Sequence, residues 1–290
     1  MHCCFCNGSW EGLGVVEHER VRGHSRESAG EHFTVWRCPS CFSLHSLEQV
    51  DLAYYYARYP LKEHRLDFVM RRAYGNRLAL LKKVGLRPDH CILDYGCGAG
   101  LFVRYLLDQG YRNAAGYDRY VPDFSDDAVL QRKNDFVTSY DVIEHFEDPR
   151  LCMQELREVT KPGGFTIIGT PNARRTDLSK QARFMVELSQ PYHRHILSED
   201  AMMRLASQSG CQLQMITHRF YLDTLFPFVN TRFAWSYLRR MGNHLDTAAE
   251  GLRISNVLSS PKLLFFAFFG YFFPVRSNFV AVFRNTARAG

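Results

Sequence analysis

From about residue 90 onward, short apolar runs alternate with segments of helical period. The runs CILDYG, NAAGYD and DFVTSYDV predict buried strands, and LFVRYLLDQ and LCMQELREVT predict amphipathic helices between them. The segment KPGGFTIIGT predicts a turn that leads into another strand. Because strands that alternate with helices build parallel sheets, we expect an α/β domain here.

The last part of this domain contains a long insertion. LSEDAMMRLASQSG predicts a helix that Ser198 caps and Gly210 closes, and the strand-like LQMITHRFYL follows it. SNFVAVFRN, near the end of the chain, is expected to pair with that strand. Residues 223–276 lie between the two and hold the apolar run LLFFAFFGYFFPV, whose 13 residues are too few to span a membrane as a helix.

Two smaller units precede the α/β part. Residues 1–48 are rich in Cys, His, Gly and Arg and lack a long apolar period, which predicts a small loop-and-hairpin unit. Residues 49–85 carry apolar side chains at helical spacing, which predicts two helices ending at Gly85. We therefore expect an N-terminal unit over 1–48, a helical linker over 49–85 and the α/β domain over 86–290.

Composition favours a globular protein, because 46% of the 290 residues are hydrophobic. The formal charge of +6 comes from 36 basic and 30 acidic residues without a long basic block, so we expect no nucleic-acid partner. The segment MHCCFCNGSW lacks the pattern of a secretory signal, so we expect a cytoplasmic protein. Closely spaced cysteines then indicate metal ligation rather than disulfides.

Two CxxC pairs stand in the N-terminal unit. Cys3 with Cys6, and Cys38 with Cys41, have the spacing of two knuckles that grip a tetrahedral Zn²⁺, which predicts a zinc-ribbon-like unit with a structural zinc. The alternative is reduced cysteines without a metal. Three further side chains could replace one of the four ligands, namely Cys4, His2 and His45. The cysteines in core-like patterns are predicted to pack: Cys91, Cys97, Cys152 and Cys211.

The sequence LDYGCGAG places Gly96, Gly98 and Gly100 between a buried strand and a helix, where bare backbone can approach a ligand. Asp94 before the loop would repel a pyrophosphate, but it suits the cationic groups of S-adenosylmethionine. Asp118, at the end of the next strand, is placed to accept hydrogen bonds from ribose hydroxyls. The plainer alternative is a tight turn that uses glycine for packing.

LDYGCGAG resembles the first motif of class I S-adenosylmethionine-dependent methyltransferases, and SYDVIEHFEDP and KPGGFTIIGTPN resemble later motifs of one branch. The resemblance covers about residues 75–220. It implies a Rossmann-like sheet of seven strands whose last strand is antiparallel, preceded here by a helical insertion. It also implies that Asp94 and the three glycines surround the methionine part of the cofactor, that Asp118 holds the ribose and that Tyr140 lines the pocket.

The region after Asp118 departs from the family pattern. Only about fifteen residues separate it from the fourth strand, where the family places a helix and the third strand. The acid that contacts adenine is therefore open between Asp126 and Asp127, and either is also compatible with a solvated loop.

The segment QPYHRHILS carries histidines, which suit proton transfer near neutral pH. It resembles the YHxH segment of zinc-containing sugar C-methyltransferases, which implies His193 as the base, with Tyr192 and His195 orienting the acceptor. Histidines at this place can also serve only for packing. His145, in VIEHF, is a further catalytic candidate whose alternative is to fix the loop and the following helix.

We therefore expect a methyltransferase for a small-molecule or glycan-type acceptor, such as a sugar nucleotide or a polysaccharide intermediate. A second hypothesis is an O-methyltransferase of a lipid or quinone-like acceptor, because Lys262 and Arg276 flank the aromatic run in a pattern typical of peripheral membrane contact. A third is a zinc-ribbon binding protein on a methyltransferase scaffold that has lost catalysis.

Overall fold

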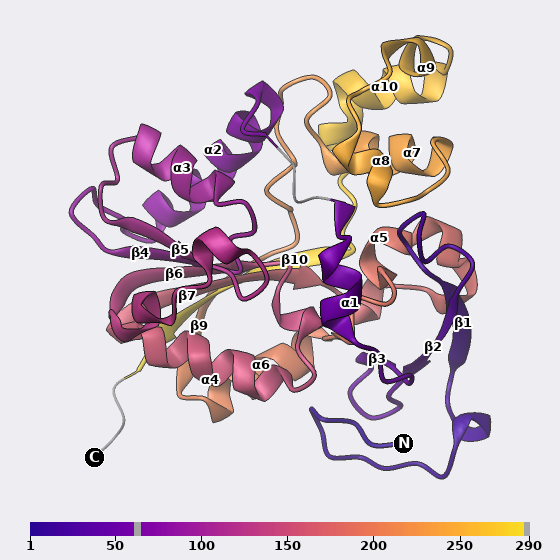
Figure 1. Cartoon of the computed structure of the whole chain (residues 1–290), viewed down its shortest axis with the longest axis horizontal. Coiled ribbons are helices and arrows are strands. Elements are labelled where there is room, and N and C mark those ends of the chain that lie inside the picture. Colours follow the sequence, from indigo (N-terminus) through magenta and orange to yellow (C-terminus); the bar gives the residue numbers. More distant parts are fainter. Residues whose placement is uncertain (61–64, 287–290) are drawn as a thin grey trace.

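The computed structural model describes residues 1–60 and 65–286. Within this part of the chain the main sheet has six strands, in which every strand but β10 runs in one direction (Figure 1). Their spatial order is β5 (Ala114–Tyr117), β4 (Ile92–Tyr95), β6 (Asn134–Tyr140), β7 (Thr160–Pro171), β10 (Asn278–Asn285) and β9 (Cys211–Thr217).

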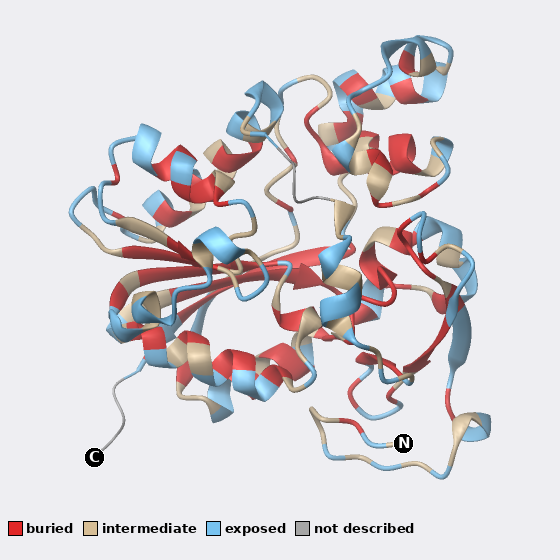
Figure 2. Cartoon of the chain, in the orientation of Figure 1, coloured by how far each residue is buried: buried red, intermediate tan, exposed pale blue. Residues whose placement is uncertain are grey.

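Helices cover both faces of this sheet. On one side lie α2 (Phe68–Lys83) and α3 (Leu101–Asp108), and on the other α4 (Pro149–Val159) and α6 (Glu199–Gln208) (Figure 1). Successive strand residues point to opposite faces, so Ile92 packs with the α2 and α3 side chains and Leu93 with those of α4 and α6. The strands β4, β6 and β10 are buried along almost their whole length (Figure 2).

The predicted alternation of strands and helices is confirmed, and Ser198 caps α6 as expected. The seven-stranded sheet is not: between β5 and β6 the described chain forms only two 3₁₀ turns, Pro122–Phe124 and Asp127–Gln131. The segment is too short for a helix and a further strand. β7 also starts earlier than predicted, since the strand already includes the KPGG turn.

The helical segment before the sheet is interrupted. α1 (Leu52–Ala57) is a short helix that ends before Arg58, and α2 begins at Phe68; residues 61–64 between them lie outside the described part. Asp51 and Asp67 cap the two helices through their carboxylates.

The N-terminal unit forms a second sheet from β1 (His18–Arg22), β2 (His32–Arg37) and β3 (Leu44–Ser46). Its fourth strand, β8 (His195–Ile196), comes from the later part of the chain and pairs with β3. One apolar cluster joins this unit to the segment that holds the short helix α5 (Met185–Leu188): Val21, Val35, Leu44, Ala173, Leu178, Phe184, Met185, Leu188 and Ile196. The unit is therefore built partly from residues distant in sequence.

The insertion before β10 is helical, as predicted. It contains α7 (Thr231–Arg240), α8 (Asp246–Ala249), α9 (Ile254–Leu258) and α10 (Pro261–Phe269), the orange and yellow group in Figure 1. Within the described residues, none of the helices combines the length and the apolar character that crossing a membrane requires.

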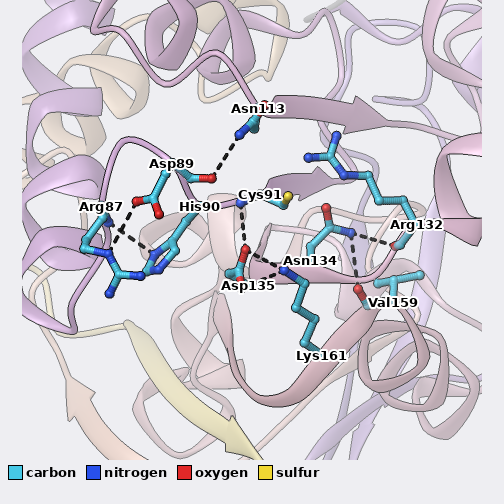
Figure 3. Close-up of polar contacts among 10 residues, drawn as sticks. All are labelled: Arg87, Asp89, His90, Cys91, Asn113, Arg132, Asn134, Asp135, Val159 and Lys161. Atoms are coloured by element: carbon cyan, nitrogen blue, oxygen red, sulfur yellow. Dashed lines mark hydrogen bonds and ion pairs between the residues drawn. The ribbon is translucent and has the colours of Figure 1, made fainter.

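Polar contacts close the amino-terminal ends of the central strands (Figure 3). Asp135 accepts a hydrogen bond from the backbone N–H of Cys91 at 2.8 Å and pairs with Lys161 at 2.9 Å. Asn134 donates to the carbonyl oxygen of Val159. These contacts occupy one edge of the sheet and leave the carboxyl-terminal edge for the loops that carry the candidate site.

Candidate active site

The glycine loop joins β4 to α3 with all three glycines in the left-handed region. A Cβ on Gly96 would lie 2.2 Å from Val142 Cγ2, and one on Gly100 would lie 2.2 Å from Phe124 Cζ, so these two positions need glycine for packing. Gly98 has φ +53°, but open space surrounds the place of its Cβ. Gly98 is therefore the position at which bare backbone borders space for a ligand.

Asp118 lies against this loop, as the sequence predicts. Its Oδ2 accepts a hydrogen bond from the Gly98 N–H at 2.9 Å, and its Oδ1 accepts one from the Tyr120 N–H at 2.9 Å. The end of β5 is thus tied to the part of the loop that borders open space. The two acids proposed for adenine each make a local contact: Asp127 accepts from the Tyr117 hydroxyl and Asp126 from the Ala128 N–H.

Asp94 is buried under the loop and is paired there. Arg77 Nη2 lies 3.0 Å from Asp94 Oδ1, and Thr138 donates to the same oxygen at 2.6 Å. Burial raises the pKa of Asp94, while Arg77 and Thr138 act in the opposite direction. Arg77 and Thr138 therefore hold this carboxylate in place beneath the loop.

Arg77 is a component of the site that sequence reasoning missed. Its guanidinium lies between the rings of Phe102 and Tyr140, at 4.0 and 3.9 Å from their centroids. Because Arg77 contacts both residues, Tyr140 and Asp94 lie close together near the glycine loop. The signal that could have found Arg77 is a charge three residues after Tyr74 and four before Leu81, on the apolar face of α2.

Asp141 was also missed. It directly follows β6, and its φ of +56° is unusual for a residue with a side chain. Although the residue is exposed at the surface, the protein around it raises the pKa of its carboxyl, against the effect of Arg77. Strained backbone and a perturbed carboxyl often coincide at functional sites, and an acid at the carboxyl end of a parallel strand was the available signal.

Three further side chains converge beyond Asp141. Glu144, His145 and His193 each offer a ligand-type atom, and these atoms lie within 4.8 Å of one another. Glu144 is fully buried; Thr170 donates to one of its oxygens at 3.0 Å, and the other has no partner among the described residues. The rings of His145 and His193 are perpendicular, with centroids 4.7 Å apart.

The hydrogen bonds of the two histidines differ. His193 Nδ1 lies 2.7 Å from the carbonyl oxygen of Glu187, which places the proton on Nδ1 and leaves a lone pair on Nε2. His145 Nδ1 lies 2.6 Å from the hydroxyl of Tyr56 on α1. Burial lowers the pKa of His193 to about 4 and that of His145 well below its usual value, so both rings are neutral at pH 7.

Tyr192 is buried, and its ring contacts those of Tyr56 and Tyr59, at centroid distances of 5.5 and 4.9 Å. His195 is directed elsewhere: it lies in β8 and faces His45 of the N-terminal sheet. The structure therefore brings Tyr192, His193 and His145 together and separates His195 from them. An orienting role for His195 gains no support from this placement.

The four predicted cysteine ligands converge from two turns. Their sulfurs lie within 4.8 Å of one another, with 3.5 Å between Cys3 and Cys41 and 3.5 Å between Cys6 and Cys38. Zinc–sulfur bonds of about 2.3 Å set tetrahedral sulfurs roughly 3.8 Å apart, so the arrangement fits a structural zinc. His2 bonds Ser9 instead and lies outside this group.

Comparison with known proteins agrees with this geometry. A family model described as a methyltransferase domain matches residues 63–215, just over half of the chain. A search of curated proteins finds no match.

Among solved structures, the chain is similar to an S-adenosylmethionine-dependent methyltransferase from Mesorhizobium loti, with 12% identity, 72% of this chain and 97% of that chain covered, and a TM-score of 0.44. It is also similar to the magnesium protoporphyrin IX methyltransferase of Synechocystis PCC 6803, solved with bound SAH, with 16% identity, coverage of 58% and 88%, and a TM-score of 0.40. The family model and the loop geometry lead to one conclusion: the chain belongs to the methyltransferase-domain family and is an enzyme with S-adenosylmethionine as its cofactor.

Proposed function

We propose that the enzyme methylates a hydroxyl group of a small-molecule or glycan-type acceptor, such as a sugar nucleotide or a polysaccharide intermediate. The observation that carries this proposal is the neutral His193, whose proton lies on Nδ1 and whose Nε2 is free to accept another. A hydroxyl is a weak nucleophile, so its methylation benefits from a positioned base. An amine that is already deprotonated would need none.

The residues divide the work by position. S-adenosylmethionine supplies the methyl group when bound, and Gly98 and Asp118 would hold it at the end of β4 and β5. Tyr56 and Tyr192 would form the acceptor wall, since aromatic rings stack on the apolar faces of sugars and exclude water. His193 would take the hydroxyl proton at Nε2 while the acceptor oxygen receives the methyl group that the bound cofactor would supply.

A matched pair of variants tests the base. His193→Asn can keep the Nδ1-type hydrogen bond to Glu187 but lacks Nε2, and we expect its turnover to fall about 10²–10⁴-fold with nearly unchanged S-adenosylmethionine affinity. His193→Gln also loses the hydrogen bond to Glu187, so its stability shows how much that bond contributes to folding. Turnover of His193→Asn equal to that of the wild type would show that another group is the base.

The acceptor class is tested with methyl-labelled S-adenosylmethionine and a fractionated cell extract. We expect label in small, water-soluble or oligosaccharide products identified by mass spectrometry. Label found only in protein or RNA would refute the proposal.

A lipid or quinone-like acceptor at a membrane surface is the second candidate, because α10 and the turn after it expose a row of aromatic rings. Phe265, Phe268, Phe269 and Phe272 are 47–64% exposed, and Lys262 precedes them. Apolar rings beside basic residues favour an anionic membrane surface. Flotation with anionic vesicles tests this: the protein should bind, Phe265→Ser/Phe269→Ser should not, and Leu107→Ser on α3 should behave as the wild type.

A further inference from the structure

Two histidine rings meet where the N-terminal sheet joins the rest of the chain. His45 on β3 and His195 on β8 are direct partners in the antiparallel ladder, and their Nδ1 atoms lie 2.9 Å apart. His45 is 2% exposed and packs against the rings of Trp36 and Phe5. Because the two Nδ1 atoms face each other at this distance, at most one of them can carry a hydrogen.

Two neutral rings cannot satisfy all the polar contacts around this pair at once. His195 Nε2 faces the carbonyl oxygen of Glu147 at 3.0 Å, which requires a hydrogen on Nε2 and leaves a lone pair on Nδ1. If His45 carries its hydrogen on Nδ1, it satisfies His195, but the lone pair of its buried Nε2 then faces the sulfur of Cys41, which as a zinc-bound thiolate has no hydrogen to donate. If His45 carries it on Nε2, beside the sulfur of Cys41, two lone pairs face each other. A cation between the two Nδ1 atoms removes the conflict.

A thiol completes the group. Cys4, His45 and His195 each offer one ligand atom, and these atoms lie within 4.8 Å of one another. We propose that these three side chains form a second metal site, distinct from the four-cysteine site, that binds a zinc-type divalent cation. One sulfur and two imidazole nitrogens suit Zn²⁺ and are poor ligands for Mg²⁺ or Ca²⁺. A water molecule can take the fourth position.

The distance between the two nitrogens requires little adjustment. Zinc–nitrogen bonds of about 2.0–2.1 Å set two nitrogens of a tetrahedral site roughly 3.3 Å apart, so the rings need to separate by about 0.4 Å. The contact between His195 and Glu147 would then fix the tautomer that presents Nδ1 to the metal, as backbone carbonyls commonly do for metal-bound histidines.

This site would join parts that the four-cysteine site does not. Cys4 and His45 belong to the N-terminal unit. His195, by contrast, follows Tyr192 of the candidate acceptor wall and the candidate base His193. A metal ion here would hold the N-terminal unit against the segment that carries the candidate base.

The zinc content of the full-length protein, purified without chelators, tests the proposal. We expect two zinc ions per chain in the wild type and one in Cys4→Ser and in His195→Ala. Cys91→Ser changes a cysteine outside both sites and should keep two. One zinc per chain in the wild type, or two in both variants, would overturn the proposal.

Cobalt gives a second readout that does not depend on counting. Co²⁺ bound in place of zinc should show thiolate charge-transfer and d–d bands from two sites, and Cys4→Ser should lose those of one. A Cys4→Ser spectrum identical to that of the wild type would contradict the assignment. S-adenosylmethionine binding, measured by calorimetry, should be the same in both proteins, so the result is independent of the proposed acceptor.

Discussion

The three loop glycines share a left-handed backbone, but different surroundings impose it. Gly96 and Gly100 each face a side chain that a Cβ would strike, whereas Gly98 faces open space. The packing explanation and the ligand explanation of the motif therefore both hold, at different positions. The sequence alone could not show which glycine serves packing and which serves the ligand, because the contacts with Val142 and Phe124 come from other loops.

Gly98→Ala separates ligand binding from folding. The new methyl group enters the space beside the loop, so we expect the Kd for S-adenosylmethionine to rise at least about tenfold, while backbone strain lowers stability by about 1–2 kcal/mol. Calorimetric titration measures the Kd. Gly30→Ala, at a position with open surroundings and an ordinary φ, should change neither quantity. An unchanged Kd in Gly98→Ala would place the cofactor elsewhere.

Buried neutral histidines predict sensitivity to mild acid. His24 is fully buried, its Nδ1 lies 2.9 Å from Ser189 Oγ, and burial lowers its pKa to about 3. The unfolded chain binds this proton below a pH of about 6.5, the folded chain only near 3. The stabilisation is therefore complete above pH 6.5 and is lost as pH falls toward 3.

The variant His24→Asn measures this effect. Between pH 7 and pH 5, the wild type should lose about 2 kcal/mol more stability than His24→Asn, as measured by urea unfolding. Equal losses in the two proteins would show that His24 accepts a proton in the folded state.

At the residue level, contacts within one strand–loop–strand segment could be predicted from the sequence. Contacts between a strand and a helix packed on the sheet could not. Asp118 is found beside Gly98, as the order of strand, loop and strand implies. The pairing of Asp94 with Arg77 depends on how α2 settles on the sheet, and no local pattern records that contact.

At the level of elements, the polar edge in Figure 3 stabilises the sheet at a distance from the site. Burial opposes ionisation of Asp135, but the hydrogen bond and charge of Lys161 together with the hydrogen bond from the Cys91 N–H outweigh it, so the pKa of this carboxyl is lowered. Asp135→Ala should cost about 1–3 kcal/mol in urea unfolding, because the Cys91 N–H loses its acceptor. S-adenosylmethionine affinity should not change.

Asp89→Ala is the control at the same edge, since its exposed ion pair with Arg87 contributes at most about 0.5 kcal/mol. Equal destabilisation by the two variants would count against a specific role for Asp135.

Long, periodic elements were predictable, and short ones were not. β6 and α4 have clear periods, and both were found where expected. β8 has only two residues, so no periodicity could reveal it or its pairing with β3. The absent third strand was foreseeable as a compression of the chain, but its replacement by 3₁₀ turns was not.

For the whole molecule, zinc removal should affect the acceptor side more than the cofactor side. The N-terminal unit packs on residues 173–196, a segment that includes His193, whereas the glycine loop contacts the residues that follow β5 and β6, namely Asp118, Phe124 and Val142. After zinc is stripped by a chelator, we expect turnover to fall by at least about tenfold and the Kd for S-adenosylmethionine to change less than about threefold. Full turnover in protein shown by metal analysis to be zinc-free would contradict this coupling.

The pairing of β3 with β8 has a consequence for biosynthesis. The two strands are separated by 150 residues, so at about 5–20 residues per second the ribosome needs roughly 8–30 s to deliver the second after the first. During that interval the nascent unit presents an open strand edge, which can pair with a neighbouring chain. Truncated translation products that end before His195 would keep that edge permanently, and they are the species we expect to aggregate or to require a chaperone.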